Sequence, residues 1–329
     1  MNYTLSELEC RNYDLARSRE WILTNNLGGY AMGTVAGICA RRYHGLLIAA
    51  IDPPTERTLL WKSVELEVRT EGRNYALSTN EYPGVVHPTG YQLLAGFEVS
   101  PQEVAWTFRL GKQILRKSLR LSQIGNQSFL TLTNLGTVPM EVFLRPILVD
   151  RSHHEDFHRN PEFPRDVRYG ADQTVLVGSH ESVIHHEGFV REPLDQWYFR
   201  FEHYRERERG LEDREDAFCA CLLRAVIPVG ESITCAVGTS ETISAGPMAD
   251  STDIPVRKSL ANIRLALTEA VAKNVITGAP RPTILAGYPW FTDWGRDTMI
   301  SLPGALLVPG RYAEARSILR AFANHGTLR

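Results

Sequence analysis

The spacing of apolar residues constrains the fold most, because it changes once along the chain. From Tyr3 to about Thr242 the sequence consists of short β-branched or aromatic runs separated by Gly, Pro, Asn and Asp, a pattern typical of strands joined by turns. The clearest runs are Thr58–Val68, Phe129–Thr133, Val142–Val149 and Thr174–Val177. We therefore predict a mainly β fold whose first part, residues 1–247, is a large antiparallel sandwich.

One pair of runs has the pattern of a hairpin. Ala217–Ile227 and Ser232–Val237 are both short and apolar, and Pro228-Val229-Gly230-Glu231 between them supplies turn residues. We predict that these two runs pair with each other as neighbouring strands.

At about Pro247 the apolar spacing changes from that of strands to that of a helix. Asp253 and Pro255 supply the cap and first-turn residues of a helix that we predict to end near Val275. Its apolar residues recur at helical spacing: Leu260, Ile263, Leu267 and Val271. The breaker residues Thr277-Gly278-Ala279-Pro280 follow, so residues 248–280 are predicted to be a helical linker.

A second helix is predicted from about Tyr312 to Phe322, with one apolar stripe formed by Tyr312, Ala315, Leu319 and Phe322. Two amphipathic helices cannot bury their apolar faces by themselves. We therefore expect the C-terminal residues either to pack on the sandwich or to belong to a larger helical domain.

Composition excludes several classes of partner. The chain has 36 Lys and Arg against 38 Asp and Glu, so no bulk charge favours nucleic acid or an anionic membrane. No run reaches the ~18 apolar residues of a membrane span, and the polar start does not resemble a secretory signal, so we expect a cytoplasmic protein.

The five cysteines of the chain lack a Cys-x-x-Cys pair, which favours reduced, buried thiols.

Two polar stretches interrupt the β-rich part. Residues 150–168 form a predicted loop that contains His153, His154 and His158. This spacing is compatible with a metal site, but no carboxylate spacing completes one, so we expect a solvated or substrate-facing loop and no bound metal. The second stretch, Arg205–Asp216, mixes charges of both signs, which favours a solvated face or connection.

A first candidate functional cluster lies near the N-terminus. Its glycine-rich part, Thr24–Gly37, has neither a Lys followed by Ser or Thr nor a Gly-x-Gly-x-x-Gly register, so we expect no nucleotide or other cofactor. The glycines instead favour a close approach of two strands, or of a loop and a ligand. Arg41, Arg42, Tyr43 and His44 follow, a donor-rich set that can orient a polyhydroxylated ligand or pair with carboxylates. Taken alone, these residues favour structural ion pairs.

A second candidate cluster lies in residues 286–298, where a helix is expected to begin. Aromatic residues interleave there with carboxylates and an arginine: Tyr288, Trp290, Phe291, Asp293, Trp294, Arg296 and Asp297. Flat aromatic faces beside directional donors and acceptors are what a sugar-binding pocket needs. The alternative is structural, with the tryptophans in a core and Asp297 as a cap or first-turn acid.

The two carboxylates of this cluster also suggest a glycosidase pair. Asp293 and Asp297 stand four residues apart, so in a helix their side chains would be neighbours at ~6 Å. An inverting glycosidase needs ~6.5–9.5 Å between carboxyl groups on opposite sides of the bond, and residues on one helical face rarely straddle a substrate. The spacing therefore does not identify the pair as acid and base.

The second cluster resembles a known family. Residues 286–306, Ala-Gly-Tyr-Pro-Trp-Phe-Thr-Asp-Trp-Gly-Arg-Asp-Thr-Met-Ile-Ser-Leu-Pro-Gly-Ala-Leu, closely resemble the opening of the amylo-α-1,6-glucosidase domain of prokaryotic-type glycogen debranching enzymes. The stretch Asn25–Leu47, with Gly-Gly-Tyr and Arg-Arg-Tyr-His-Gly-Leu-Leu, is similar to the N-terminal domain of the same enzymes. Trp197-Tyr198-Phe199, Arg209-Gly210-Leu211 and Glu215-Asp216 also look like the family, so the resemblance spans nearly the whole chain.

The resemblance implies a β-supersandwich at residues 1–247, a helical linker at 248–280 and the first helices of an incomplete (α/α)6 toroid at 281–329. It implies inverting hydrolysis of the α-1,6 branch points of glycogen or limit dextrin, with an acid and a base that lie beyond residue 329. The isolated chain is then expected to be inactive and to need the remainder of the toroid, in the same chain or in a second subunit.

The residues that the resemblance assigns are binding residues for α-glucan. Arg296 and Asp297 match a pair that holds the sugar in related glucoamylases, and Trp290 and Trp294 would wall the pocket. The same predicted set is completed by Tyr288, Asp293, Arg41, Arg42 and His44. Two other classes stay open: a non-catalytic α-glucan-binding or scaffold protein, and another toroid enzyme such as a glucoamylase or disaccharide phosphorylase.

Overall fold

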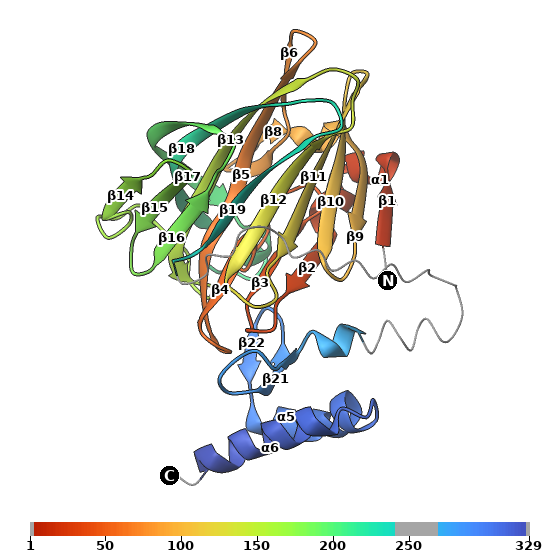
Figure 1. Cartoon of the computed structure of the whole chain (residues 1–329), viewed down its shortest axis with the longest axis vertical. Coiled ribbons are helices and arrows are strands. Elements are labelled where there is room, and N and C mark those ends of the chain that lie inside the picture. Colours follow the sequence, from red (N-terminus) through yellow and green to blue (C-terminus); the bar gives the residue numbers. More distant parts are fainter. Residues whose placement is uncertain (1–2, 241–268, 327–329) are drawn as a thin grey trace.

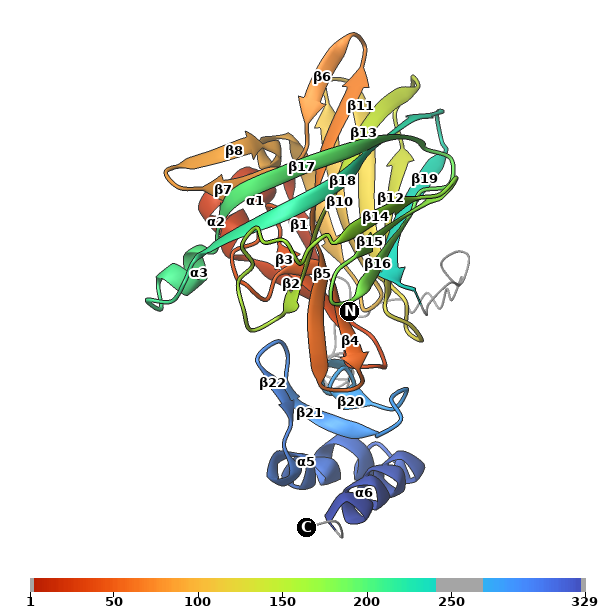
Figure 2. The same cartoon turned by 90° about the vertical axis from the view of Figure 1, so that its left-hand side faces the viewer.

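In a computed structural model, which describes residues 3–240 and 269–326, two large antiparallel sheets pack face to face (Figures 1 and 2). The first sheet has nine strands in the order β1 (Tyr3–Ser6), β9 (Leu94–Val99), β10 (Glu103–Leu110), β11 (Gln113–Leu121), β12 (Gln127–Asn134), β19 (Ser232–Thr239), β16 (Glu181–His185), β15 (Gln173–Val177) and β14 (Asp166–Tyr169). The mainly β, antiparallel fold class is confirmed.

The second sheet has eight strands in the order β17 (Val190–Glu202), β18 (Arg214–Ile227), β13 (Met140–Ser152), β5 (Glu56–Thr70), β4 (Gly45–Asp52), β3 (Tyr30–Thr34) and β2 (Glu20–Thr24), with β6 (Arg73–Ala76) also paired to β5. A separate ribbon pairs β7 (Thr79–Tyr82) with β8 (Val85–Thr89). Short helices lie in the connections between strands: α1 (Glu7–Arg11), α2 (Tyr13–Ser18), η1 (Gly90–Leu93) and α3 (Tyr204–Arg207).

The main core lies between the two large sheets and continues over the outer face of β5. Residues 57–64 of β5 are all buried, whereas its later residues alternate between buried and partly exposed positions. Continuous burial indicates that both faces of this part of the strand are covered. Trp61 near the middle of this strand is fully buried, and β5 is an inner strand of its sheet. None of the described helices is long and apolar enough to cross a membrane.

The predicted hairpin between Ala217–Ile227 and Ser232–Val237 is wrong, although both runs are strands. β18 pairs with β13 and β17, whereas β19 pairs with β12 and β16 in the opposite sheet. The connection between them is bound by Asn134 at the end of β12, whose N–H donates to Glu231 O (3.0 Å). A connection that crosses between sheets has the same local turn residues as a hairpin, so only the long-range pairing distinguishes them.

The glycines of the N-terminal cluster permit a close approach, as predicted. Gly28 has a φ of 100°, and a Cβ at this position would lie 2.4 Å from the carbonyl oxygen of Pro54. All five cysteines are free, four of them buried and Cys39 half-buried, which confirms the prediction of buried thiols for four of the five.

The C-terminal part lies at one end of the sandwich, next to β4 and β5 (Figures 1 and 2). Its sheet has the order β20 (Val275–Ile276), β21 (Thr283–Gly287) and β22 (Phe291–Asp293), followed by α5 (Gly295–Leu302), the π-helical turn η2 (Pro303–Leu307) and α6 (Tyr312–Gly326). Most of the predicted linker helix, and the boundary between residues 247 and 248, lie outside the described residues. Residues 269–272 are helical, and that helix ends before Val275.

The helix predicted at Tyr312–Phe322 is confirmed as α6, but its apolar stripe is only partly correct. Ala315 and Ile318 are buried and Phe322 packs against them, in a small core with α5, η2 and the three-stranded sheet. Tyr312 and Leu319, which we expected in the stripe, are exposed. The small core covers only one face of α6, and Tyr312 and Leu319 lie outside that face.

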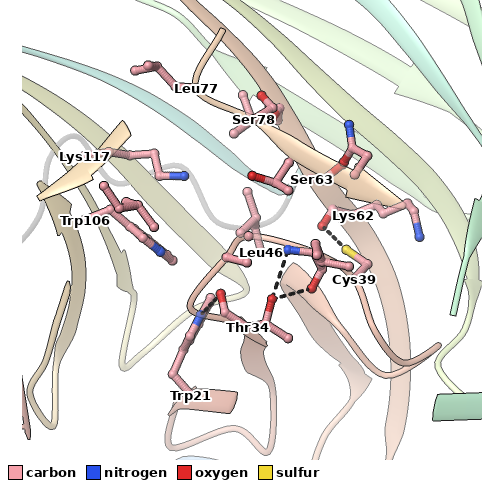
Figure 3. Close-up of a pocket in the computed structure, with 18 of the residues that line it drawn as sticks. Trp21, Thr34, Cys39, Leu46, Lys62, Ser63, Leu77, Ser78, Trp106 and Lys117 are labelled. Atoms are coloured by element: carbon pink, nitrogen blue, oxygen red, sulfur yellow. Dashed lines mark hydrogen bonds between the residues drawn. The ribbon is translucent and has the colours of Figure 1, made fainter. Parts of the chain in front are cut away.

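A small cavity of about 40 Å³ lies between the two large sheets (Figure 3). The ammonium group of Lys117 and the hydroxyl of Ser63 point toward it, beside Trp21 and Trp106. Lys117 Nζ lies 4.3 Å from the ring centre of Trp106. Within the described part of the chain, no carboxylate forms an ion pair with it, and burial lowers the pKa of Lys117 to about 8.

Candidate functional site

The candidate site begins at the β21–β22 hairpin and the first turn of α5. The loop between these strands carries Trp290, and Trp294 precedes α5 as its N-cap residue. Both side chains are exposed, Trp294 to 58%. Both tryptophans therefore lie on the surface of the described part of the chain, so the alternative interpretation of Trp290 and Trp294 as core residues is wrong.

Arg57 holds this hairpin against the sandwich. Its Nη1 donates hydrogen bonds to the carbonyl oxygens of Pro289 (3.3 Å) and Phe291 (3.2 Å), and its Nε donates to Gly28 O (3.0 Å). The same guanidinium carbon lies 4.8 Å from the ring centre of Tyr288. Arg57 is almost fully buried, and its role was not predicted from the sequence. The one signal available was a charged residue directly before the mainly apolar run Thr58–Trp61.

Tyr288 is placed differently from the other aromatic residues of the cluster. Its ring packs edge to face on Tyr30 of β3, with ring centres 5.6 Å apart, and burial raises its pKa. Tyr288 therefore faces the sandwich, where it supports the loop that carries Trp290.

The N-terminal cluster meets the C-terminal cluster at Trp290. The guanidinium carbon of Arg41 lies 5.5 Å from the ring centre of Trp290, and the ring of Tyr43 lies edge to face against the same indole at 6.3 Å. Arg41 also donates from Nε to Glu20 Oε1 (2.6 Å). The two sequence clusters thus form one surface, in which Arg41 and Tyr43 come from the sandwich.

His44 and Arg42 lie behind this surface. Ala40 N–H donates to His44 Nδ1 (3.1 Å), and His44 Nε2 lies 3.3 Å from Glu20 Oε1. Burial lowers the pKa of His44. Burial raises the pKa of Glu20, but its contacts with His44 and Arg41 outweigh this effect and lower that pKa to about 2. His44 is fully buried, so it orients the loop through Glu20 and Ala40.

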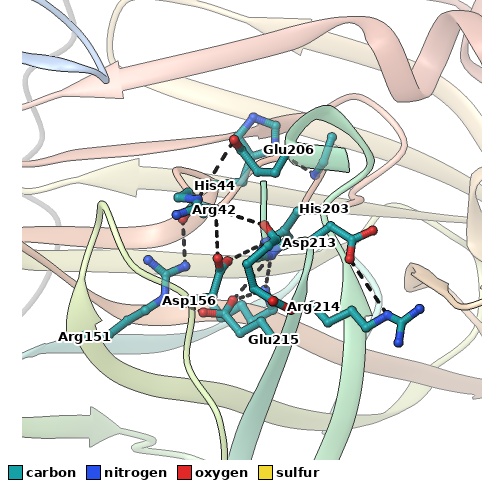
Figure 4. A network of polar contacts seen from close by, with 12 residues as sticks. Arg42, His44, Arg151, Asp156, His203, Glu206, Asp213, Arg214 and Glu215 are labelled. Carbon is teal, nitrogen blue, oxygen red and sulfur yellow. Dashed lines mark hydrogen bonds and ion pairs between the residues drawn. The ribbon is translucent and has the colours of Figure 1, made fainter. Parts of the chain in front are cut away.

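Arg42 belongs to a buried network of charges (Figure 4). Its Nη2 lies 2.9 Å from Asp156 Oδ2, and Asp156 Oδ1 lies 3.1 Å from His203 Nδ1. His203 in turn contacts Glu215, which is also paired with Arg151 and with Lys62 of β5. Arg42 thus forms the structural ion pairs that its residue type favours.

The network corrects the prediction for Arg205–Asp216 as a solvated stretch. Glu206 and Glu215 are completely buried within this stretch, although most of their charged neighbours are exposed. Burial raises the pKa of Glu215, but the charges of Arg151 and Lys62 dominate and hold it well below its usual range. The charged residues of this stretch show no periodicity from which the buried ones could be predicted. The burial of Glu215 therefore could not be predicted from composition alone.

The three histidines of the polar loop do not converge. His153 is buried, its Nδ1 donates to Arg57 O (3.1 Å), and its ring lies against that of His154, with ring centres 3.9 Å apart and planes tilted by 40°. Burial and the nearby charges lower the pKa of His153 to about 3, so it is neutral at pH 7. His158 lies in the exposed part of the loop, near Asp216 (3.9 Å).

The two carboxylates of the C-terminal cluster have different surroundings. Asp293 lies in β22, not in a helix, and its Oδ2 pairs with Arg281 (2.9 Å) and accepts a hydrogen bond from Thr283 (3.1 Å). Asp297 lies in the first turn of α5, as the structural alternative predicted, where its carboxylate is partly exposed beside Arg296 (3.6 Å). Asp297 is therefore the carboxylate of this cluster that is open to a ligand.

Two family models match the sequence. The model described as "Glycogen debranching enzyme N terminal" matches residues 19–234, and the model described as "Amylo-alpha-1,6-glucosidase" matches residues 265–327. Similar solved structures include a putative kojibiose phosphorylase from the human microbiome (10% identity, 65% of this chain and 29% of that chain, TM-score 0.33).

Two further structures are similar to this chain. They are a GalM/aldose epimerase homologue from C. elegans (10% identity, 66% of this chain and 97% of that chain, TM-score 0.34) and a bacterial glucoamylase complexed with acarbose (9% identity, 70% and 31%, TM-score 0.30). The chain spans less than a third of the phosphorylase and of the glucoamylase. Because the first family model alone matches more than half of the sequence, this chain belongs to the glycogen debranching enzyme family.

Proposed function

We propose that this chain binds α-glucan for the hydrolysis of α-1,6 branch points in glycogen or limit dextrin. The binding surface is formed by Trp290, Trp294, Arg296 and Asp297, together with Arg41 of the sandwich. The observation that carries the proposal is the exposure of two tryptophans and of the Asp297 carboxylate within eight residues of one another, in a chain that belongs to the debranching enzyme family.

The chemistry of this surface suits a neutral sugar. Indole faces pack against the C–H patches of a pyranose ring, while carboxylate oxygens accept hydrogen bonds from its hydroxyl groups and a guanidinium donates to its oxygens. Arg41 is already held by Glu20 (2.6 Å), so it orients the indole of Trp290 at little further entropic cost. Asp297 is expected to bind two sugar hydroxyls through its two oxygens.

The proposed reaction is an inverting hydrolysis, in which an acid protonates the leaving oxygen and a base activates water. Asp293 does not serve in either role, because its carboxylate is occupied by Arg281 and Thr283. We therefore assign binding to this cluster, and the acid and base to carboxylates outside the described residues.

The test of this function is the product formed from a branched limit dextrin by the protein that contains this chain. Proton NMR is expected to show glucose released first as the β-anomer, and Asp297→Ala is expected to lower the rate by roughly a hundredfold or more. The control is Asp166→Ala on β14, an exposed carboxylate of the sandwich. Release of the α-anomer, or an unchanged rate in the Asp297 variant, contradicts the proposal.

A second candidate is a non-catalytic α-glucan-binding protein, which is favoured by the occupied carboxylate of Asp293. This protein would bind limit dextrin without releasing glucose from it. A toroid phosphorylase would instead release sugar phosphate when phosphate is added. One assay on limit dextrin with and without phosphate therefore separates a hydrolase, a phosphorylase and a non-catalytic binding protein.

A further inference from the structure

We propose a second α-glucan-binding site on the outside of the sandwich, formed by an open groove beside the loop 153–165 and by the aromatic side chains of Trp197 and Phe199 on β17. The proposal rests on the proposed function, because it takes the same polymer as its ligand.

The groove has the size and polarity of a ligand site. Its volume is about 490 Å³, within the ~300–1,000 Å³ of small-molecule sites. Exposed polar side chains line it, among them Glu155, His158, Arg159 and Asn160. Charges of both signs face the groove, so it offers hydrogen bonds in several directions without a dominant charge. Such a surface suits a neutral polyhydroxylated chain better than an anion.

An aromatic platform adjoins the groove. Trp197 and Phe199 alternate along β17 and therefore point to the same side of the strand. Their ring centres are 6.4 Å apart and their planes differ by 25°, in a stacked arrangement, so the two rings form one aromatic pair on this side of the strand. Phe199 is 47% exposed, whereas Trp197 is partly buried against the main core.

The platform and the groove are parts of one surface. Phe157 lines the groove, and its ring is almost parallel to that of Trp197, with an angle of 7° and a centre distance of 6.2 Å. Arg159 also lines the groove, and its guanidinium carbon lies 5.6 Å from the ring centre of Trp197. A glucan chain on the platform would therefore extend directly into the polar groove.

The backbone around this surface is fixed before any ligand binds. One carboxylate, that of Asp216, accepts hydrogen bonds from the backbone N–H groups of Arg159 (3.1 Å) and Arg200 (3.0 Å). Arg200 has a φ of 64°, which marks an irregular position of β17 next to Phe199. Asp216 thus joins the loop to the strand, and such preorganisation lowers the entropic cost of binding.

The same loop connects this surface with the first site. The side chain of His154, at the start of the loop, lies 3.2 Å from the hydroxyl of Tyr43, and Tyr43 contacts Trp290. Glycogen offers many chain ends, so two sites on one protein would bind one particle with greater avidity than either site alone. We therefore expect the groove to take a linear α-1,4-linked segment while the first site takes the branch.

The test is electrophoresis of the chain through gels that contain glycogen, with maltoheptaose titrations by calorimetry as a second measurement. Phe199→Ala is compared with Phe199→Trp, which keeps an aromatic face, and with Tyr3→Ala, a control of equal exposure (48%) on β1. Each variant is made in the natural sequence and also with Trp290→Ala, which weakens the first site.

In the Trp290→Ala background, Phe199→Ala is expected to weaken the remaining glycogen binding about tenfold, a loss of ~1.4 kcal/mol. Phe199→Trp and Tyr3→Ala should bind as the parent does. Unchanged binding by Phe199→Ala in both backgrounds overturns the second site and leaves the first intact. A loss with Phe199→Ala but none with Trp290→Ala overturns the first site instead and supports the groove.

Discussion

The guanidinium group of Arg41 lies over the indole ring of Trp290, with 5.5 Å between the guanidinium carbon and the ring centre. These two residues belong to two sequence clusters that were each expected to bind sugar, one in the sandwich and one before the first C-terminal helix. Their contact shows that the sandwich contributes side chains to the surface around Trp290. The geometry of this surface therefore depends on the residues that hold the two parts together.

Arg57→Lys is expected to loosen the hairpin that carries Trp290. A lysine keeps the charge but cannot donate to Gly28, Pro289 and Phe291 in the planar geometry of a guanidinium group. Hydrogen exchange should increase in residues 288–293, with a loss of about 1–3 kcal/mol of stability. Arg69→Lys, on the exposed end of the same strand, is the control. Equal exchange in both variants would refute the anchoring role of Arg57.

Glu215→Gln is expected to destabilise the fold by roughly 3–5 kcal/mol, because it leaves the cations of Lys62 and Arg151 buried without their partner. Urea unfolding measures this loss, with Glu212→Gln as a control at an exposed position of the same charged stretch. A loss no larger than that of the control would show that the network does not stabilise the fold.

The stabilising contribution of Glu215 is expected to depend on pH. The folded-state pKa of Glu215 lies below its usual value, so its stabilising contribution is complete above the unfolded pKa of a glutamate and is lost as the pH falls through the folded pKa. The difference in unfolding free energy between the natural protein and Glu215→Gln should therefore be constant at neutral pH and shrink on acidification.

Lys117→Met is expected to stabilise the protein at pH 7 by roughly 1–3 kcal/mol, because it removes an ammonium group that is buried without an ion-pair partner among the described residues. The pKa of Lys117 is about 8 in the folded state, against 10.5 for an ordinary lysine. The cost of the charge is thus complete below about pH 8 and disappears as the pH rises from there toward 10.5.

Thermal unfolding of Lys117→Met and of Lys112→Met, an exposed control on the preceding turn, tests this expectation across that pH range. A stabilisation that does not diminish between pH 8 and pH 10.5 would mean that the charge of Lys117 is not its cause.

The helical C-terminal part is expected to make the isolated chain self-associate. Ile300 of α5 is 73% exposed and Val308, just after η2, is 72% exposed, and exposed apolar patches of this kind promote association. Light scattering should show a mass that rises with concentration, and Ile300→Lys with Val308→Lys should reduce it. Ile124→Lys, at an equally exposed position in the sandwich, is the control. A concentration-independent monomer mass would contradict this prediction.

The sequence predicted the strands better than their partners. Strand runs such as Val142–Val149 are local features, because β-branched and aromatic residues suit a pleated, half-buried surface. The partners of β18 and β19 depend on contacts distant in sequence, and the hairpin expected between them does not form. The domain boundaries at residues 247/248 and 280/281 stay predictions.

The candidate site was predictable where its residues form a compact motif. Trp290, Trp294 and Asp297 lie within eight residues of one another, and the structure leaves all three open to solvent. Arg57 was not predictable, because its role depends on carbonyl groups more than 230 residues away. The roles of His44 and Arg42 also depend on burial, which places them behind the surface rather than on it.

The most direct test of the central claim, that the surface around Trp290 and Asp297 binds α-glucan, is the affinity of this chain for a branched α-glucan oligosaccharide measured by calorimetry. Trp290→Ala and Asp297→Ala should each weaken binding at least tenfold, since each removes a group proposed to contact the sugar. The controls Tyr3→Ala and Asp166→Ala should bind as the natural chain does. Equal affinity in all five proteins would contradict the account.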